Sequence, residues 1–121
     1  MCEAVAALSE SEVTEIAVYY ADQGREASVE SFDANLAAEG ALLHEKHCSN
    51  CHWPPDRDGV EDAIGIPLHG QKKEYIRFAL EAYFAGDRES LVQTMADAIH
   101  ELRPGDLGAL INYYASYRSL D

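Results

Sequence analysis

Two cysteines and a histidine stand together in the run Cys48-Ser49-Asn50-Cys51-His52. Two thiols at this spacing can each form a thioether to a vinyl group of haem, and the histidine directly after them can bind the iron. With 3 Cys and 5 His among 121 residues, a shuffled chain would contain this motif with a probability of only about 0.3%. The motif therefore predicts one covalently attached haem c.

Zinc sites and redox dithiols also use Cys-x-x-Cys pairs, and both are weaker interpretations of this sequence. A zinc site needs a second pair of Cys or His ligands, and the only further cysteine, Cys2, has no partner near it in the sequence. A thioredoxin-like dithiol follows a strand, whereas a helical pattern precedes Cys48. Haem attachment remains the favoured interpretation beside these two alternatives.

A second iron ligand is expected from the long segment that follows the motif. The chain continues for 69 residues beyond His52, which is typical of class I cytochromes c with a methionine ligand well downstream. Met95 is the only methionine after the motif and is therefore the candidate. A thioether opposite an imidazole raises the reduction potential of the iron. His69 or His100 as the ligand, and Met95 as an ordinary core residue, are the alternatives.

Apolar residues recur with the period of an α-helix in five segments, and no strand pattern competes with them. A capping box of Ser9 and Glu12 predicts the start of the first helix, and Pro104 is expected in the first turn of the last. A loop rich in Gly and Pro is expected over 53–67, while His44 and His47 are expected to pack or to face solvent. The sequence thus predicts an all-α fold of four to five helices. The stripes are Val13, Ile16, Ala17 and Tyr20; Leu36, Gly40, Leu43 and His47; Ile76, Leu80, Tyr83 and Phe84; Leu91, Met95, Ile99 and Leu102; and Leu107, Leu110, Ile111 and Tyr114.

An internal repeat concerns the N-terminal part of the chain. Residues 1–23 match residues 95–117 without a gap, with six identities that include Tyr-Tyr-Ala at positions 19–21 and 113–115. A shared helical period explains part of this match but does not require so many identities in one register. We therefore expect residues 1–30 to be the last two helices of a preceding cytochrome c-like domain plus a linker. Residues 31–121 are expected to form the haem-binding domain.

Composition narrows the classes of partner. The chain has 9 Lys and Arg against 22 Asp and Glu, a formal net charge of −13. Nucleic acids and anionic membranes require clustered basic residues, so both are disfavoured as partners. The chain contains no run of 18 apolar residues, so insertion into a membrane is not predicted. Instead we expect a redox partner with a basic docking face, or a saline habitat.

The chain resembles the C-terminal haem domain of the dihaem cytochrome subunit of flavocytochrome c sulfide dehydrogenase, and more broadly the c4-type class I cytochromes. The resemblance covers residues 31–117 and implies the class I cytochrome c fold around one haem, while residues 1–23 resemble the end of that family's first haem domain. It is carried by SFDANLAAEGALLHEKHCSNCH, by IPLHGQKKEYIRFALEAYFAGDR, by Met95 and by the final YYASY.

The resemblance also implies roles for residues outside the motif. Gly40 is expected where the first helix of the haem domain crosses the last one, against Tyr113 or Tyr114. A backbone carbonyl of the segment Ile66-Pro67-Leu68, centred on Pro67, is expected to accept the ring N–H of His52.

Two further residues are expected at the haem propionates. Tyr75 and Arg88 are the candidates, Arg88 because a guanidinium can bind a carboxylate through two hydrogen bonds. An ordinary surface or core role is the alternative for both residues.

The expected function is electron transfer without bond chemistry of its own, so the chain is not expected to be an enzyme by itself. The resemblance implies a periplasmic protein that accepts electrons from a flavoprotein that oxidises sulfide. A free c4-like shuttle to an oxidase or another acceptor is the alternative, and a haem sensor or peroxidase with an open iron site is a third.

Residues 1–30 contain one basic residue, Arg25, and no apolar signal segment. A processed or truncated chain, or a single-haem relative of the dihaem family, is therefore expected.

Overall fold

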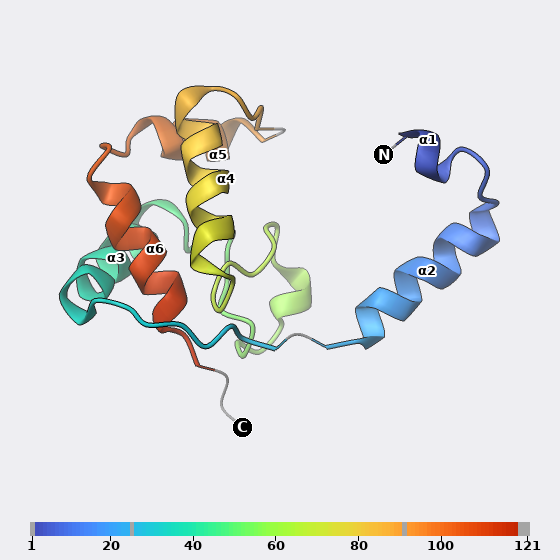
Figure 1. Cartoon of the computed structure of the whole chain (residues 1–121), viewed down its shortest axis with the longest axis horizontal. Helices are drawn as coiled ribbons and strands as arrows, with labels where there is room; N and C mark the ends of the chain where they lie inside the picture. Colours follow the sequence, from blue (N-terminus) through green and yellow to red (C-terminus); the bar gives the residue numbers. More distant parts are fainter. Residues whose placement is uncertain (1, 25, 91, 119–121) are drawn as a thin grey trace.

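A computed structural model describes residues 2–24, 26–90 and 92–118, and all of the regular structure in this part is helical. The all-α prediction is confirmed, but the described residues form six α-helices instead of four to five, because the four-residue α1 precedes α2 as a separate helix. Figure 1 shows the helices in chain order, with α3 to α6 gathered into one body. The elements are α1 (Cys2–Val5), α2 (Glu10–Asp22), α3 (Ala34–His47), a short 3-10 helix (Val60–Asp62), α4 (Lys73–Ala85), α5 (Gln93–His100) and α6 (Asp106–Ser116).

Helices α3 and α6 cross at the centre of this body, and α4 packs against both α6 and α5. The crossing lies at Gly40, as expected. A Cβ at this position would collide with the carbonyl group of Ala109 and would lie 2.7 Å from the Cβ of Tyr113. The two helices can therefore approach this closely only because residue 40 has no side chain. Tyr113, rather than Tyr114, is the tyrosine next to Gly40.

The core lies between α4, α5 and α6, and the predicted stripe of α6 faces it. Leu110, Ile111 and Tyr114 are the largest fully buried side chains. Ile76 from α4 and Ile99 from α5 pack against them. Each fully buried aliphatic or aromatic side chain of this size contributes about 1.5–3 kcal/mol to folding, so this cluster makes a large contribution to the stability of the protein.

Helix ends follow local signals closely, with one exception. The capping box is confirmed, because Ser9 N donates to the Glu12 carboxylate at 2.8 Å and Glu12 N donates to Ser9 Oγ at 3.3 Å. Helix α4 ends at Gly86, which takes the left-handed conformation with φ +82. The prediction for Pro104 is wrong, because α6 begins only at Asp106.

A tight turn explains this later start of α6. Asp106 N donates to Arg103 O at 2.9 Å, and Arg103 N donates to the Asp106 carboxylate at 2.8 Å. These hydrogen bonds close a turn over 103–106, which contains Pro104 and places the first helical residue after it. The Arg103 guanidinium and backbone also hold the pKa of Asp106 below its ordinary value by hydrogen bonding. The stripe predicted for α5 begins at Leu91, which lies outside the described residues.

Helices α1 and α2 follow the register of the repeat in their secondary structure. Shifted by the same offset, α2 ends at the last residue of α6, and α1 falls within α5. Their packing differs, because no residue of α2 is buried and the closely packed helix pairs of the described residues do not include α2. The origin of this segment as part of a second domain stays a prediction.

The linker after α2 is fastened to the body of the protein. Ser28 N donates to Gly70 O at 2.8 Å, and the carboxylate of Glu30 accepts a hydrogen bond from Lys73 N at 2.7 Å. Arg118 Nη2 also donates to the carbonyl of Glu30 at 2.9 Å. Among the helices of residues 2–24, 26–90 and 92–118, none has the length and apolar character needed to cross a membrane.

Candidate functional site

The Cys-x-x-Cys-His motif forms a single turn at the end of α3. Cys48 is the residue that caps α3, and its N–H donates to His44 O at 2.8 Å. Cys51 N and His52 N then both donate to Cys48 O, at 3.1 and 2.9 Å. This turn brings two free, half-buried thiols and one imidazole into the same small region.

The ring of His52 is held in one orientation by the backbone. Its Nδ1 lies 2.7 Å from the carbonyl oxygen of Ile66. A carbonyl can only accept a hydrogen bond, so the proton of the neutral ring resides on Nδ1 and Nε2 keeps its lone pair. A backbone carbonyl of the segment Ile66-Pro67-Leu68 was expected to accept this proton, and the structure shows that it is the carbonyl of Ile66, the residue before Pro67. The ring presents Nε2 as a ready metal ligand.

Gly65 makes room for this ring. A Cβ at Gly65 would lie 2.6 Å from both Cε1 and Nδ1 of His52. Gly65 N also donates to Cys51 O at 2.9 Å, which fixes the loop beside the motif. The sequence indicates only that Gly65 lies in a loop, because the need for a glycine depends on where the histidine ring lies.

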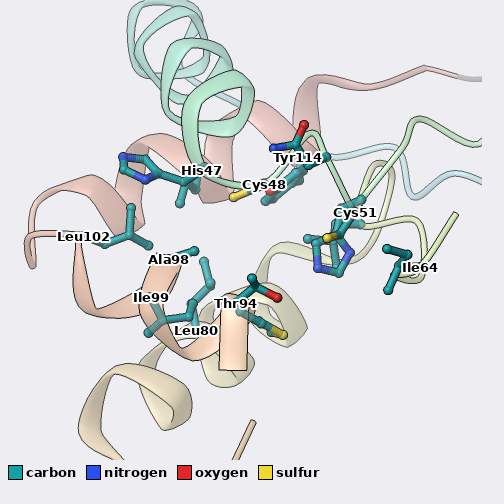
Figure 2. A pocket seen from close by; sticks show the side chains of 15 residues that line it. His47, Cys48, Cys51, Ile64, Leu80, Thr94, Ala98, Ile99, Leu102 and Tyr114 are labelled. Atoms are coloured by element: carbon teal, nitrogen blue, oxygen red, sulfur yellow. The ribbon is translucent and has the colours of Figure 1, made fainter. Parts of the chain in front are cut away.

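An apolar cavity of about 370 Å³ opens in front of the motif. This volume lies within the range of about 300–1,000 Å³ that is usual for ligand pockets. Figure 2 shows Cys48 and Cys51 on one side of the cavity, with Thr94 and Ile99 of α5 opposite them. Its walls come from the last residue of α3, the motif, the following loop, α4, α5 and α6, so every helix from α3 to α6 contributes to it.

Met95 lines this cavity, together with Cys48, Cys51 and His52. The two alternative ligands lie elsewhere. His69 is buried against Tyr113 and Tyr114 and does not line the cavity, and His100 is exposed and borders a different pocket. Among the candidates for the second axial ligand, the structure thus brings only Met95 to the cavity that holds the motif.

The two residues expected at the propionates do not line this cavity. Tyr75 is exposed at the start of α4 and borders a shallow pocket with Gly70. Leu80, which does line the cavity, lies five positions further along the helix and so on nearly the opposite face from Tyr75. Arg88 lies beyond the end of α4, with its guanidinium 4.7 Å from the ring centroid of Tyr83.

Tyr114 connects the cavity to a buried histidine. It lines the cavity together with Cys48, and its hydroxyl lies 3.1 Å from His44 Nδ1. Burial raises the pKa of the Cys48 thiol and lowers the pKa of His44, so both side chains are held in their neutral forms near neutral pH. The helical period predicts that Tyr114 lies on the core face of the last helix, but it does not indicate what the hydroxyl contacts.

His47 packs, which is one of the two positions expected for it, and its side chain is only 6% exposed. It borders the cavity, and its Nδ1 lies 3.2 Å from the carboxylate of Glu101. This contact joins the last turn of α3 to the end of α5.

The zinc alternative lacks support in the described residues. Within residues 2–24, 26–90 and 92–118, no group of three or more His, Cys, Asp and Glu side chains could hold a metal ion by itself. The motif region supplies two thiols and one imidazole without a further pair of ligands.

In comparisons with known proteins, no family model matches the chain, and no curated protein matches it significantly.

Proposed function

We propose that the chain is an electron-transfer cytochrome with one haem c, attached through Cys48 and Cys51 and ligated by His52 and Met95. The observation that carries this proposal is the hydrogen bond between His52 Nδ1 and Ile66 O at 2.7 Å. It leaves Nε2 free to bind iron beside a cavity that both thiols and Met95 line.

The residues around the cavity fit this cofactor chemically. Haem is a flat and largely apolar ring with two vinyl groups, and the cavity offers two thiols at its edge and apolar side chains such as Leu80, Ile99 and Leu110. An imidazole and a thioether are the axial ligands that favour reduced iron. A bound haem would supply one-electron exchange between ferrous and ferric iron.

The protein's own residues set the conditions for this exchange. The Ile66 carbonyl orients the ring of His52 and increases its strength as a ligand. Apolar side chains from α4, α5 and α6 line the cavity and would limit the access of water to a bound haem. A low-polarity environment disfavours the more highly charged ferric iron and so favours the ferrous form. If His52 and Met95 both bound the iron, the site would have no open position for a substrate. This property separates the proposal from a sensor or a peroxidase.

The partner is proposed from charge and from the resemblance. A net charge of −13 favours association with a redox protein that has a basic docking face. We propose that the donor is a flavoprotein that oxidises sulfide, that the complex acts in the periplasm, and that a free shuttle to an oxidase is the second candidate. Purification of the protein from its source distinguishes the two, because a flavin-containing subunit remains bound only in the first case.

The first experiment tests attachment. The full chain, exported to the periplasm of a host with a haem c maturation system, should carry one haem that survives denaturation and organic extraction. The variant Cys48→Ala/Cys51→Ala should lose covalent haem, while Ser49→Ala, inside the same turn, should keep it. A native protein without covalent haem, or with its mass raised by zinc instead, would contradict the proposal.

The second experiment tests the axial ligand. Met95→Ala should convert the iron to a high-spin form that binds CO in the ferrous state, and should lower the potential by on the order of 0.1–0.3 V, within the roughly 0.8 V over which axial ligands tune haem. His100→Ala, an exposed change on the same helix, should leave the spectrum unchanged. If the unmodified ferrous protein bound CO readily, or if Met95→Ala left the spectrum unaltered, ligation by Met95 would be wrong.

A further inference from the structure

Helix α2 carries an apolar stripe that the described structure leaves in contact with solvent. Val13, Ile16 and Tyr20 lie on one face of the helix and are 47%, 44% and 70% exposed. Figure 1 shows α1 and α2 apart from the body formed by α3 to α6. The stripe belongs to a helix that contributes nothing to the cavity or to the core.

Two physical reasons indicate that this stripe is covered when the protein works. An isolated helix shorter than about 12–15 residues is marginal in water, and α2 has 13 residues. The corresponding stripe of α6 is buried in full, including its tyrosine at the equivalent position, Tyr114. The same pattern of residues therefore forms a packed helix where a partner surface is present.

The charge of the segment limits what can cover it. Residues 2–24 contain Glu3, Glu10, Glu12, Glu15 and Asp22 and no Lys or Arg. Glu10 and Glu12 lie on either side of the stripe at its N-terminal end. A second copy would bring the same five carboxylates to the contact, and an anionic lipid surface would also repel them. An apolar groove bordered by basic residues matches both the stripe and its acidic border.

We propose that α2 docks through Val13, Ile16 and Tyr20 into an apolar groove of a partner protein whose rim carries Lys and Arg. The contact does not depend on haem and does not rest on the proposed electron-transfer function. Because Ser28 and Glu30 fasten the linker to Gly70 and Lys73, a partner held by α2 stays tethered close to the body of the protein. Such a tether raises the effective concentration of the partner without any contact at the cavity.

The test uses the full protein and a synthetic helical peptide of the length of α2, with a leucine stripe flanked by lysines. Binding is measured by fluorescence anisotropy and located by amide hydrogen exchange. We expect the peptide to slow exchange over residues 10–22 and to bind less tightly as salt increases. A matched peptide with glutamate in place of each lysine should bind at least about tenfold more weakly.

A pair of variants on α2 makes the test specific. Ile16→Ser should weaken binding at least about tenfold. Val18→Ser changes a side chain that is 54% exposed on the opposite side of the same helix and should have little effect. Both variants substitute serine for a β-branched residue in a solvent-exposed position, so loss of helix content affects them alike.

Five results would overturn the proposal. Equal binding of the lysine and glutamate peptides would show that the partner needs no basic rim. Equal loss of affinity in Ile16→Ser and Val18→Ser would show that the apolar stripe is not the contact surface. Protection confined to residues 34–116 would place the contact elsewhere on the acidic surface. Sedimentation that shows a dimer abolished by Ile16→Ser would assign α2 to a second copy. Binding of the protein to neutral phosphatidylcholine vesicles through α2 would assign it to a lipid surface.

Discussion

Helices α2 and α6 have similar sequences in one register but opposite environments. Ile16 corresponds to Leu110 and Tyr20 to Tyr114, yet the two α6 residues are fully buried while both α2 residues are exposed. The helical period predicted both helices, because it reports which residues share a face. It does not report what covers that face, since this depends on residues far away in the sequence, such as Gly40 on α3.

One position in the pair explains why α2 is not a simple replacement for α6. Ala109 is buried where α6 meets Gly40, and Glu15 occupies the equivalent place in α2. A carboxylate at such a close crossing would be removed from water without a partner, which is costly. Helix α2 therefore suits a contact that is looser on this side than the crossing of α3 and α6.

The tyrosine pair should give the largest difference between the two helices. Tyr114→Ala should lower the free energy of unfolding by about 3–5 kcal/mol, because it empties a fully buried position. Tyr20→Ala should change it by no more than about 0.5 kcal/mol, because Tyr20 is exposed. Urea denaturation of the purified variants, followed by circular dichroism, measures both values.

Conservative variants keep this comparison useful if Tyr114→Ala does not fold. Tyr114→Phe retains the ring but removes the hydroxyl that contacts His44, so a loss of about 0.5–1.5 kcal/mol is expected. Tyr20→Phe should have no measurable effect. Equal effects of the two substitutions would show that α2 is packed as α6 is, contrary to the described structure.

Glycines should give the next largest effect and test what holds α6 in place. Gly40→Ala should destabilise the protein by about 1–3 kcal/mol, because the new Cβ would push α3 away from Ala109 and Tyr113. Gly108→Ala lies on α6 in open space and should stabilise it by about 0.5–1 kcal/mol through helix propensity. Thermal and urea unfolding of both variants provide the measurement. A stabilising Gly40→Ala would show that the helices do not cross as closely as described.

The smallest expected effect is the dependence of the stability on pH. It arises at His44, which contacts Tyr114 of α6 and, among the described residues, has no counterpart beside Tyr20 of α2. Burial lowers the pKa of His44 below 6.5 in the folded protein. The unfolded chain therefore binds a proton at a higher pH than the folded protein does. Stability from this residue is complete above 6.5 and decreases as the pH falls below 6.5 toward the folded pKa.

Unfolding measured between neutral and mildly acidic pH tests this linkage. The slope from His44 cannot exceed about 1.4 kcal/mol per pH unit, the limit for one proton. His44→Gln should be less stable at neutral pH and should show a shallower decline in acid. A decline of the same slope in the variant would assign the acid sensitivity to another group.

Local features of the fold could be predicted from the sequence, because neighbouring residues determine them. The capping box at Ser9, the helix that runs into Cys48 and the end of α4 at Gly86 all depend on signals within one helical turn. The start of α6 was misplaced because Arg103 and Asp106 form a turn that a proline rule does not capture.

The candidate site was predictable only in part. Cys48, Cys51 and His52 are adjacent in sequence, so their proximity required no knowledge of the fold. Met95 was predicted because a long segment follows the motif and because it is the only methionine there, and the structure brings it to the same cavity. Tyr75 and Arg88 do not line that cavity, since this depends on which face of α4 turns inward and where the chain goes after Gly86.

The two hydrogen bonds that join the motif to Gly65 and Ile66 also bracket the intervening loop. Gly65 N meets Cys51 O at 2.9 Å and His52 Nδ1 meets Ile66 O at 2.7 Å, so both ends of the loop are closed at its base. Residues between these bonds can then be inserted, deleted or exchanged with little effect on the orientation of His52. The segment 53–63, which does not line the cavity, is thus a part of the molecule where evolution or engineering can graft a new recognition surface while the imidazole stays in place.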